Sequence, residues 1–224
     1  MLDWSFDSGC RTEAGPVCGT DEAGRGPLAG PVVAAVVVLP EGLFIPGLDD
    51  SKKLTEKKRE ALYDVILREA EAWGIALATP GEIDRMNILA ASLLAMRRAV
   101  GQVKEKIVPG IVLADGNQRT DFGVPCRPVV KGDGISPSIA AASVLAKVTR
   151  DRMMEELDGQ YPLYGFAKHK GYPTREHKLA VFEWGPCPEH RRSFLSFLER
   201  DRAALEAALA EKKAAEAERG GGTP

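Results

Sequence analysis

Acidic residues stand at the ends of three apolar stretches of the chain. Asp21 and Glu22 end the first stretch, and Asp115 and Asp133 each come directly before a glycine at the end of another. Because neighbouring strand ends lie close together in an α/β sheet, these four carboxylates are expected to form one cluster. Two like charges about 4 Å apart repel by roughly 4 kcal/mol at an effective dielectric near 20, so such a cluster needs cations.

A divalent cation such as Mg²⁺ meets that need, because it takes oxygen ligands and bridges to substrate phosphate. The four acids therefore favour a two-metal hydrolytic site, in which one ion holds a hydroxide and the second stabilises the leaving 3′-oxygen. For any one of these acids alone the alternative is a turn or helix cap, since Asp before Gly is common at strand ends. All four together with Gly24-Arg25-Gly26 favour the metal site.

Three further motifs are candidates for phosphate binding. Gly24-Arg25-Gly26 can bring backbone N–H groups close to a phosphate or sugar, although an ordinary turn with a solvated arginine is the alternative. Lys52 and Lys53 are either a phosphate clamp or a charged helix entry. Ser143 and Lys147 lie one helical turn apart and can face the site.

A stretch of bases and aromatics from Lys168 to Tyr172 suits nucleic-acid binding, with the Tyr172 ring stacking on a sugar or base. The alternative is a surface loop packed by Tyr164 and Phe166. The three histidines of the chain show no metal-ligand spacing, so they are interpreted as structural or substrate-side residues.

Alternating strand and helix patterns predict an α/β fold with a mixed central sheet flanked by helices. Strands are expected from Val17 to Asp21, Pro31 to Leu39, Ile75 to Ala78, Ile111 to Ala114 and Cys126 to Val130. Helices are expected after the N-cap Thr55, from Pro80 to Met96, from Ser138 to about Leu157, and after the N-cap Thr174 to Trp184. The Gly- and Pro-rich connection between the first two strands favours an antiparallel pair.

Asp21 and Glu22 pose a geometric problem, because adjacent residues of a strand point to opposite faces of a sheet. For both to serve one site, the strand must end or bulge at Glu22. The Ala23-Gly24 pair that follows permits such a break.

Composition divides the chain into three parts. Residues 1–15 are polar, and an irregular, flexible N-terminus is expected there. Residues 16–202 form one main domain, with a small helical C-terminal portion from about residue 160. Residues 203–224 extend the final helix into a tail that is expected to be frayed or disordered from Lys212 onward.

The chain of 224 residues with 44% hydrophobic content can bury a substantial core. Its net charge of −2 gives no global sign of a nucleic-acid partner, so any basic footprint must be local. Four cysteines without paired spacing indicate reduced thiols. No apolar run reaches the roughly 18 residues of a membrane span, and the N-terminus lacks a secretory pattern. A soluble, cytoplasmic protein is therefore expected.

Ordered motifs along the chain resemble the ribonuclease HII family. They are Asp-Glu-Ala-Gly-Arg-Gly at 21–26, Leu-Asp-Asp-Ser-Lys-Lys-Leu at 48–54, Ala-Ala-Ser-Leu-Leu-Ala-Met at 90–96, Ala-Asp-Gly at 114–116, Lys-Gly-Asp at 131–133, the Ala-rich run at 139–151, and Tyr-Gly-Phe to His-Lys-Gly-Tyr at 164–172. The resemblance runs in order from about residue 17 to residue 197, and the N-terminal 15 residues and the tail after about Arg202 lie outside it.

The resemblance implies a ribonuclease H-like fold and endonucleolytic cleavage of RNA within RNA/DNA hybrids. The family's metal-binding acids correspond to Asp21, Glu22, Asp115 and Asp133, with Mg²⁺ or Mn²⁺ as cofactor. Its turn that reads the ribonucleotide 2′-OH corresponds to Gly24-Arg25-Gly26.

The family's junction-sensing tyrosine corresponds to Tyr172, which implies incision on the 5′ side of a single ribonucleotide embedded in duplex DNA. The products would carry 5′-phosphate and 3′-hydroxyl ends. RNA/DNA hybrids and ribonucleotide-containing DNA are the implied partners, with replication or repair proteins as further candidates. No membrane association is expected, and a monomer is the default state.

Two other functions are weighed against this one. A metal nuclease acting on DNA, such as a junction resolvase, would ignore replacement of a lone ribonucleotide by a deoxyribonucleotide. A non-catalytic hybrid-binding module would bind without metal and without turnover, which the presence of all four acids disfavours.

Overall fold

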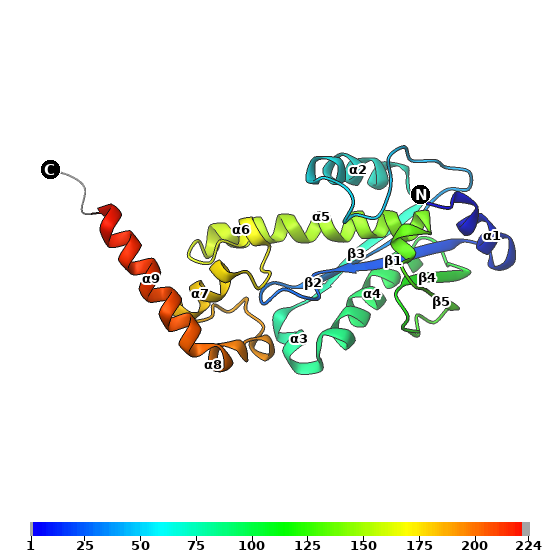
Figure 1. Cartoon of the computed structure of the whole chain (residues 1–224). Helices are drawn as coiled ribbons and strands as arrows, with labels where there is room; N and C mark the ends of the chain where they lie inside the picture. The colour runs from blue at the N-terminus through cyan, green and yellow to red at the C-terminus, as the bar shows by residue number, and fades with distance from the viewer. Residues whose placement is uncertain (1, 221–224) are drawn as a thin grey trace. The chain divides into compact units, whose positions relative to one another are not determined.

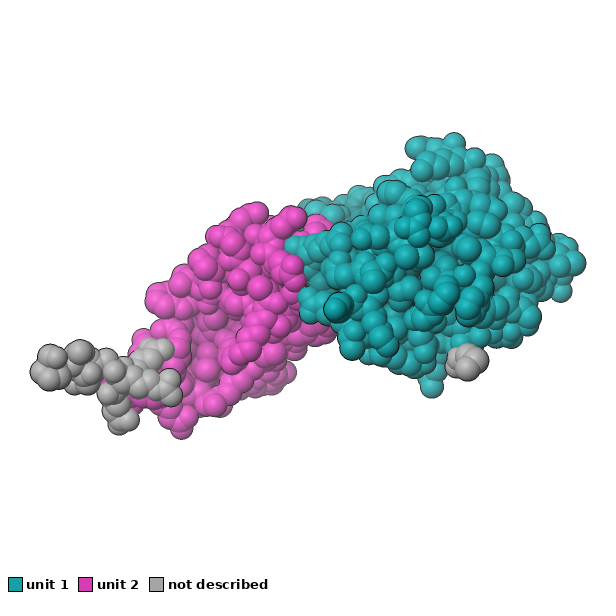
Figure 2. All heavy atoms as spheres, turned by 90° about the horizontal axis from the view of Figure 1, so that it is seen from above, with its two compact units in different colours: residues 1–25, 31–152 teal, residues 26–30, 153–224 magenta. Residues whose placement is uncertain are grey.

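The computed structural model describes residues 2–220 of the chain. The chain forms two compact units, shown in different colours in Figure 2. Unit 1 comprises residues 1–25 and 31–152, and unit 2 comprises residues 26–30 and 153–224. The long helix α5 contains the boundary at Arg152, and the short segment 26–30 belongs to unit 2 although it follows β1 in the sequence.

Unit 1 contains a mixed five-stranded sheet, as the sequence predicts (Figure 1). Its strands are β1 (Val17–Ala23), β2 (Val32–Val38), β3 (Ala72–Ala78), β4 (Ile111–Asp115) and β5 (Cys126–Val129), in the order β3-β2-β1-β4-β5. The β1-β2 pair is antiparallel, as predicted, and the β2-β3 pair is antiparallel too. The β1-β4 and β4-β5 pairs are parallel, so these three strands end at the same edge.

Helices cover both faces of this sheet (Figure 1). The helices α2 (Glu56–Glu69) and α5 (Pro137–Gln160) share one core with β2, whereas α4 (Ile88–Lys104), preceded by α3 (Pro80–Met86), packs on the other face. The first turns of α5 present alanines to the sheet, and their small side chains permit close approach. Both faces of β2 are fully buried as a result, which explains its uninterrupted Val/Ala sequence.

Residues near the N-terminus form the helix α1 (Trp4–Ala14), so the prediction of an irregular segment is wrong there. The side chain of Asp3 caps α1 by accepting a hydrogen bond from Ser5 N. Phe6 and the buried Cys10, four residues apart, pack into a core with residues of β1 and β4. Trp4 packs against the core that β2, α2 and α5 share, but these few apolar positions stand in a mostly polar sequence, which is why composition concealed the helix.

Unit 2 is helical. Its helices are α6 (Phe166–His169), α7 (Arg175–Trp184), α8 (Phe197–Arg200) and α9 (Arg202–Gly220), together with the end of α5. Thr174 caps α7 by accepting from His177 N, as predicted. Helix α8 ends at Arg200 and α9 begins at Arg202, so Asp201 interrupts the helical segment, and a short 3-10 turn at Arg192–Phe194 precedes α8.

The predicted disorder of the tail is wrong as far as Gly220, because α9 continues to that residue. Its Ala-, Glu- and Lys-rich sequence has high helix propensity, and Lys212 makes a 2.8 Å ion pair with Glu183 on α7. The part of that prediction that concerns residues 221–224 lies outside the described residues.

The four cysteines, all within the described part of the chain, are free thiols. Within residues 2–220, no helix combines the length and the hydrophobicity that crossing a membrane would require.

Gly19 of β1 tests how closely α5 packs on the sheet. A Cβ atom at this position would lie 2.3 Å from Ile139 N and from Ser138 C, which are backbone atoms. We expect Gly19→Ala to lower the free energy of unfolding by about 3 kcal/mol or more, at the upper end of overpacking effects. Gly9→Ala is the control: Gly9 lies in α1 with nothing within 4 Å, and a gain of about 0.5–1 kcal/mol is expected. Urea unfolding measures both variants, and equal effects would contradict the packing argument.

Candidate active site

Three carboxylates from distant parts of the sequence meet at one edge of the sheet in unit 1. Thr20 of β1 pairs with Ala114 of the parallel strand β4, so the residues that follow them, Asp21 and Asp115, lie side by side. Asp133 comes from the 3-10 turn Gly132–Gly134 after β5. One carboxylate oxygen of each of the three acids lies within 4.8 Å of the others.

Asp115 also holds the turn that carries Asp133. Its Oδ1 accepts hydrogen bonds from Gly132 N at 2.7 Å and from Asp133 N at 3.4 Å. Gly132 packs so closely that a Cβ atom there would lie 2.6 Å from Ile139 Cδ1. Because the turn occupies Oδ1, the other oxygen of Asp115 is the one left for a ligand role.

Burial and mutual repulsion dominate the electrostatics of these acids. Burial raises the pKa of Asp21 well above its ordinary value, and the charges of Glu22, Asp115 and Asp133 raise it further. Burial followed by the charge of Asp133 also raises the pKa of Asp115. The donor set therefore fits a divalent metal ion, which takes hard oxygen ligands and supplies the positive charge that crowded carboxylates need.

Lys52 supplies part of that charge. Its Nζ donates to Asp133 Oδ2 at 2.9 Å. Burial lowers the pKa of Lys52, but the hydrogen bond and the charge of Asp133, with that of Asp21, outweigh it, so the pKa is raised. The side chain is nevertheless 75% exposed, so the ammonium can move if another cation takes its place.

Glu22 lies outside the group of three acids. The strand β1 continues to Ala23, and Glu22 pairs in regular register with Ala34, so the predicted end or bulge at Glu22 is wrong. Strand alternation puts Glu22 on the face opposite Asp21, where it makes a 3.2 Å ion pair with Arg25 and lines a cavity of about 40 Å³ with Asp115. Burial raises the pKa of Glu22, while the charge of Arg25 opposes that rise.

The turn after Glu22 requires glycine at its first position. Gly24 has φ +99°, and a Cβ atom there would lie 2.0 Å from Arg150 Nε. Arg150 is fully buried in α5, and its Nε donates to Pro31 O at 3.0 Å. Arg150 is not among the residues predicted from the sequence, where its one signal is an arginine within the Ala-rich run.

The other predicted phosphate ligands of unit 1 are dispersed. Lys53 makes a 3.2 Å ion pair with Asp49 at the surface instead of joining the acids. Ser143 is buried, and its hydroxyl donates to Ser51 Oγ at 2.6 Å, where it supports the loop that carries Lys52. The structure therefore brings only Lys52 of these three candidates to the carboxylates.

In unit 2, Gly26 lies against Tyr172. A Cβ atom at Gly26 would lie 3.7 Å from Tyr172 Cε1, and the tyrosine is 43% exposed. Leu28 N donates to Gly171 O at 2.8 Å, so the segment 26–30 pairs with the loop that ends in Tyr172. The buried Arg191 supports the same segment, because its guanidinium donates to Gly30 O at 2.9 Å and to Pro27 O at 2.8 Å.

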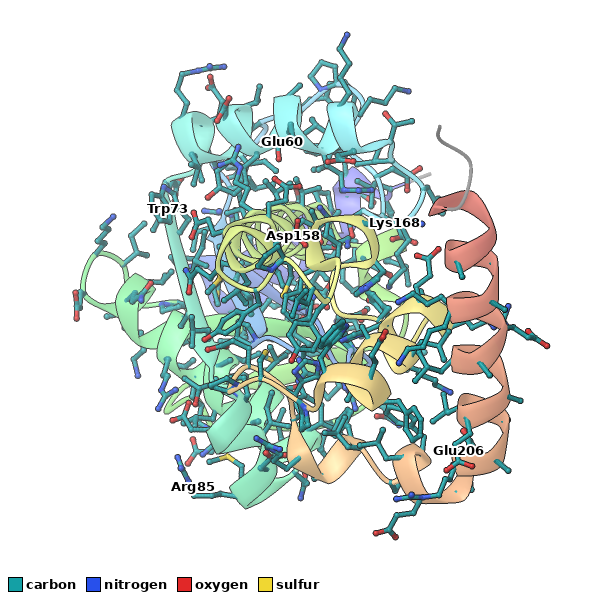
Figure 3. All side chains as sticks on the ribbon, turned by 90° about the vertical axis from the view of Figure 1, so that its left-hand side faces the viewer. Glu60, Trp73, Arg85, Asp158, Lys168 and Glu206 are labelled. Atoms are coloured by element: carbon teal, nitrogen blue, oxygen red, sulfur yellow. The ribbon has the colours of Figure 1, made fainter. Side chains whose placement is uncertain are left out.

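Lys168 on α6, labelled in Figure 3, makes a 2.8 Å ion pair with Glu176 at the start of α7. Lys170 makes a 2.6 Å ion pair with Glu155 at the end of α5. The bases of the stretch from Lys168 to Tyr172 thus have acidic neighbours, which the sequence pattern did not indicate.

Two buried histidines form a hydrogen-bond chain that ends on the backbone of Tyr172. Cys187 N donates to His190 Nδ1 at 3.1 Å, so a neutral His190 carries its proton on Nε2. That Nε2 lies 3.0 Å from His177 Nε2, which must accept, and His177 Nδ1 then donates to Tyr172 O at 2.9 Å. Burial lowers the pKa of both histidines to about 4. The bond from Cys187 N therefore requires a neutral His190, and the bond between the two rings requires a neutral His177.

Comparison with known proteins identifies the family. The ribonuclease HII family model matches residues 18–197. The chain belongs to the ribonuclease HII family. A ribonuclease HII of Shewanella amazonensis is 58% identical over 182 residues, which cover 81% of this chain and 87% of that relative. A ribonuclease HII of Geobacter sp. is 57% identical over 178 residues, covering 80% of this chain and 76% of that relative.

Solved structures agree with the ribonuclease HII assignment. The ribonuclease H2 of Pyrococcus horikoshii has a TM-score of 0.67 and 30% identity, covering 83% of this chain and 98% of its own. The ribonuclease HII of Archaeoglobus fulgidus, solved as a complex with PCNA, has a TM-score of 0.68 and 26% identity, covering 80% and 93%. The predicted ribonuclease H-like fold is confirmed, and the chain is a ribonuclease H, an endonuclease of a family that cleaves the RNA of RNA/DNA hybrids.

Crowding of the carboxylates has a measurable effect on metal-free stability. Because the folded-state pKa of Asp21 is raised, its contribution to stability falls as pH rises from its ordinary value of 3.8 through the raised value. We expect Asp21→Asn to raise the free energy of unfolding at pH 7.5 in EDTA, by about 1–2 kcal/mol as is common for single substitutions, because the amide carries no charge to be repelled. Asp64→Asn on the exposed surface of α2 is the control, expected within about 0.5 kcal/mol of wild type. A loss of stability in Asp21→Asn would show that the acids do not repel.

The two histidines are expected to make the folded state less stable as pH falls, the opposite of the effect expected for Asp21. Folded-state pKa values of about 4 lie below the ordinary 6.5, so stability is lost as pH falls from about 6.5 to about 4. We expect His190→Gln, whose amide can still accept and donate but does not titrate, to lose less stability over this window than wild type, by about 1 kcal/mol or more. Urea unfolding in EDTA at pH 7.5 and pH 5 measures the difference. If wild type and His190→Gln lose the same stability between these two pH values, the histidines are not held in the neutral form.

Proposed function

We propose that this chain incises duplex DNA on the 5′ side of a single embedded ribonucleotide, in addition to cutting the RNA strand of RNA/DNA hybrids, by two-metal hydrolysis. The products carry 5′-phosphate and 3′-hydroxyl ends. The observation that carries this proposal is the convergence of Asp21, Asp115 and Asp133 within 4.8 Å, with burial and repulsion acting on Asp21. A phosphodiester hydrolase needs such a set of oxygen donors.

In the proposed mechanism, Asp21, Asp115 and Asp133 would hold Mg²⁺ or Mn²⁺, and Glu22, which lines a cavity with Asp115, would supply a fourth carboxylate. A divalent ion bound there would polarise the scissile phosphate and lower the pKa of the attacking water. Asp115 keeps the turn of Asp133 in place through Oδ1, and its carboxylate would also serve as a ligand of the ion. Lys52 stands beside Asp133, where an ammonium can bind a phosphate oxygen, and Lys53 and Ser143 remain weaker candidates.

Discrimination of RNA from DNA is assigned to two segments. The Gly24-Arg25-Gly26 turn begins at a buried position where only glycine fits and exposes Arg25 and Gly26, which suits contact with a ribose 2′-OH. Tyr172 is half-exposed beside Gly26, and its ring is available for stacking at the junction between ribonucleotide and deoxyribonucleotide.

The remaining parts of the proposal concern organisation and context. Residues 16–202 form the catalytic domain, with the helical portion from about residue 160 included, and residues 203–224 extend it. The enzyme acts as a monomer in the cytoplasm on hybrids and on ribonucleotide-containing DNA. The PCNA complex of the Archaeoglobus homologue supports replication proteins as further partners.

Cleavage of a labelled DNA duplex with one ribonucleotide tests the proposal. Wild-type protein with Mg²⁺ or Mn²⁺ is expected to incise 5′ to the ribonucleotide, whereas EDTA or an all-DNA duplex gives no product. Loss of an outer-shell partner of a metal typically lowers activity by about 10–100-fold. Asp115→Asn is expected to lower activity by more than this, because it removes a ligand. Circular dichroism confirms that the variant is folded.

The product pattern distinguishes the alternatives. Cutting of long hybrids without cutting at the single ribonucleotide would remove the junction role of Tyr172. Equal cutting of the all-DNA duplex would indicate a DNA nuclease, and metal-independent binding without turnover would indicate a binding module. Full activity of Asp115→Asn would disprove the assignment of the acids.

A further inference from the structure

The N-terminal helix α1 contacts the segment that connects Asp133 to α5. Asp3 N donates to Ile135 O at 3.0 Å. One carboxylate oxygen of Asp7 accepts from Ser136 Oγ at 2.6 Å, and the other accepts from Ser138 N at 2.9 Å and from Ser138 Oγ at 2.5 Å. These contacts come from residues that precede the family match, which begins at residue 18.

Asp7 completes the N-terminal cap of α5. The first N–H groups of a helix have no partner within it and carry partial positive charge. Ser136 Oγ accepts from Ile139 N at 3.2 Å, while the Asp7 carboxylate accepts from Ser138 N. Asp7 therefore supplies both a hydrogen-bond acceptor and a negative charge at the start of the helix, from a distant part of the chain.

The same contacts restrain Asp133. Gly132 O accepts from Ile135 N at 3.0 Å and from Ser136 N at 2.8 Å, so the turn that carries Asp133 is closed on Ser136. Asp115 holds the beginning of this turn through Gly132 N, and Asp7 holds its end through Ser136 Oγ. Asp133 is thereby fixed from both sides.

We infer that Asp7 of α1 is a positioning residue of the active site, which holds the Asp133 turn in the geometry that binds a divalent metal ion. This role rests on the proposed function, because it requires that Asp133 is a metal ligand. By this role, the helix α1, which lies outside the family match, contributes to metal affinity. A change in α1 is therefore expected to alter metal binding at the carboxylates.

Mn²⁺ binding without nucleic acid tests this role independently of turnover. Isothermal titration compares wild type, Asp7→Ala and Asp7→Asn at a temperature at which thermal unfolding shows that all three are folded. We expect the dissociation constant of Mn²⁺ to be about tenfold higher for Asp7→Ala than for wild type, at the lower end of effects for outer-shell partners. Asp7→Asn keeps the shape and one acceptor, so a smaller increase is expected. Thr79→Ala is the matched control, because Thr79 caps α3 in the same unit by accepting from Glu82 N at 3.2 Å.

The outcomes separate this inference from the proposed function. A raised dissociation constant in Asp7→Ala with an unchanged one in Thr79→Ala supports the positioning role. If wild type binds Mn²⁺ and both alanine variants bind it equally well, Asp7 only stabilises the fold and the inference is wrong. If wild type binds no Mn²⁺, the metal assignment of the proposed function is wrong, and the inference is wrong with it.

Discussion

Repulsion among buried carboxylates is the constraint on which the rest of this structure depends. Asp21 is only 5% exposed, and its neighbours Glu22, Asp115 and Asp133 all raise its pKa. Such crowding is unfavourable for the folded state unless positive charge is present. Lys52 neutralises only part of this charge, because it pairs with Asp133 alone and its side chain is largely exposed. A divalent ion would neutralise more of the negative charge, so the excess of carboxylates itself favours metal binding.

The scaffold holds these groups together mainly through backbone contacts. The parallel pairing of β1 with β4 places Asp21 beside Asp115, and the N–H of Gly132 binds the Asp115 carboxylate. Gly19 and Gly132 permit direct contact with the start of α5, which follows Asp133 in the chain. The sheet, the turn and the first turn of α5 therefore form one packed unit around the acids, and α1 adds to it through Asp7.

In the helical unit 2, hydrogen bonds between buried neutral side chains order the backbone. Its polar core is a chain of neutral histidines whose tautomers are dictated by a backbone donor at one end and a backbone acceptor at the other. Burial keeps these rings uncharged, so their directionality persists at neutral pH. The chain ends on the carbonyl of Tyr172, and the buried Arg191 binds the carbonyls of the neighbouring segment 26–30. Both devices order backbone near the residues assigned to ribonucleotide recognition.

Much of the fold and of the site could be predicted from the sequence, because residue type and periodicity are local properties. The uninterrupted Val/Ala run of β2, the caps Thr55 and Thr174, and the acids at strand ends were all visible in this way. The helix α1 was missed because only a few apolar residues, Trp4, Phe6 and Cys10, mark its packed side. The continuation of α9 was missed because a polar composition was interpreted as disorder.

The sequence by itself determined which chemistry is possible, since four acids, a glycine-rich turn and the ordered motifs specify the family. Only the tertiary structure decided which groups meet. The register of β1 against β2 puts Glu22 on the face opposite Asp21, and packing of α5 buries Ser143 while it brings Arg150 beneath Gly24. The contacts of Ser143 with Ser51, of Arg150 with Gly24 and of Asp7 with Ser136 each join residues at least 92 positions apart, and no local pattern encodes such contacts.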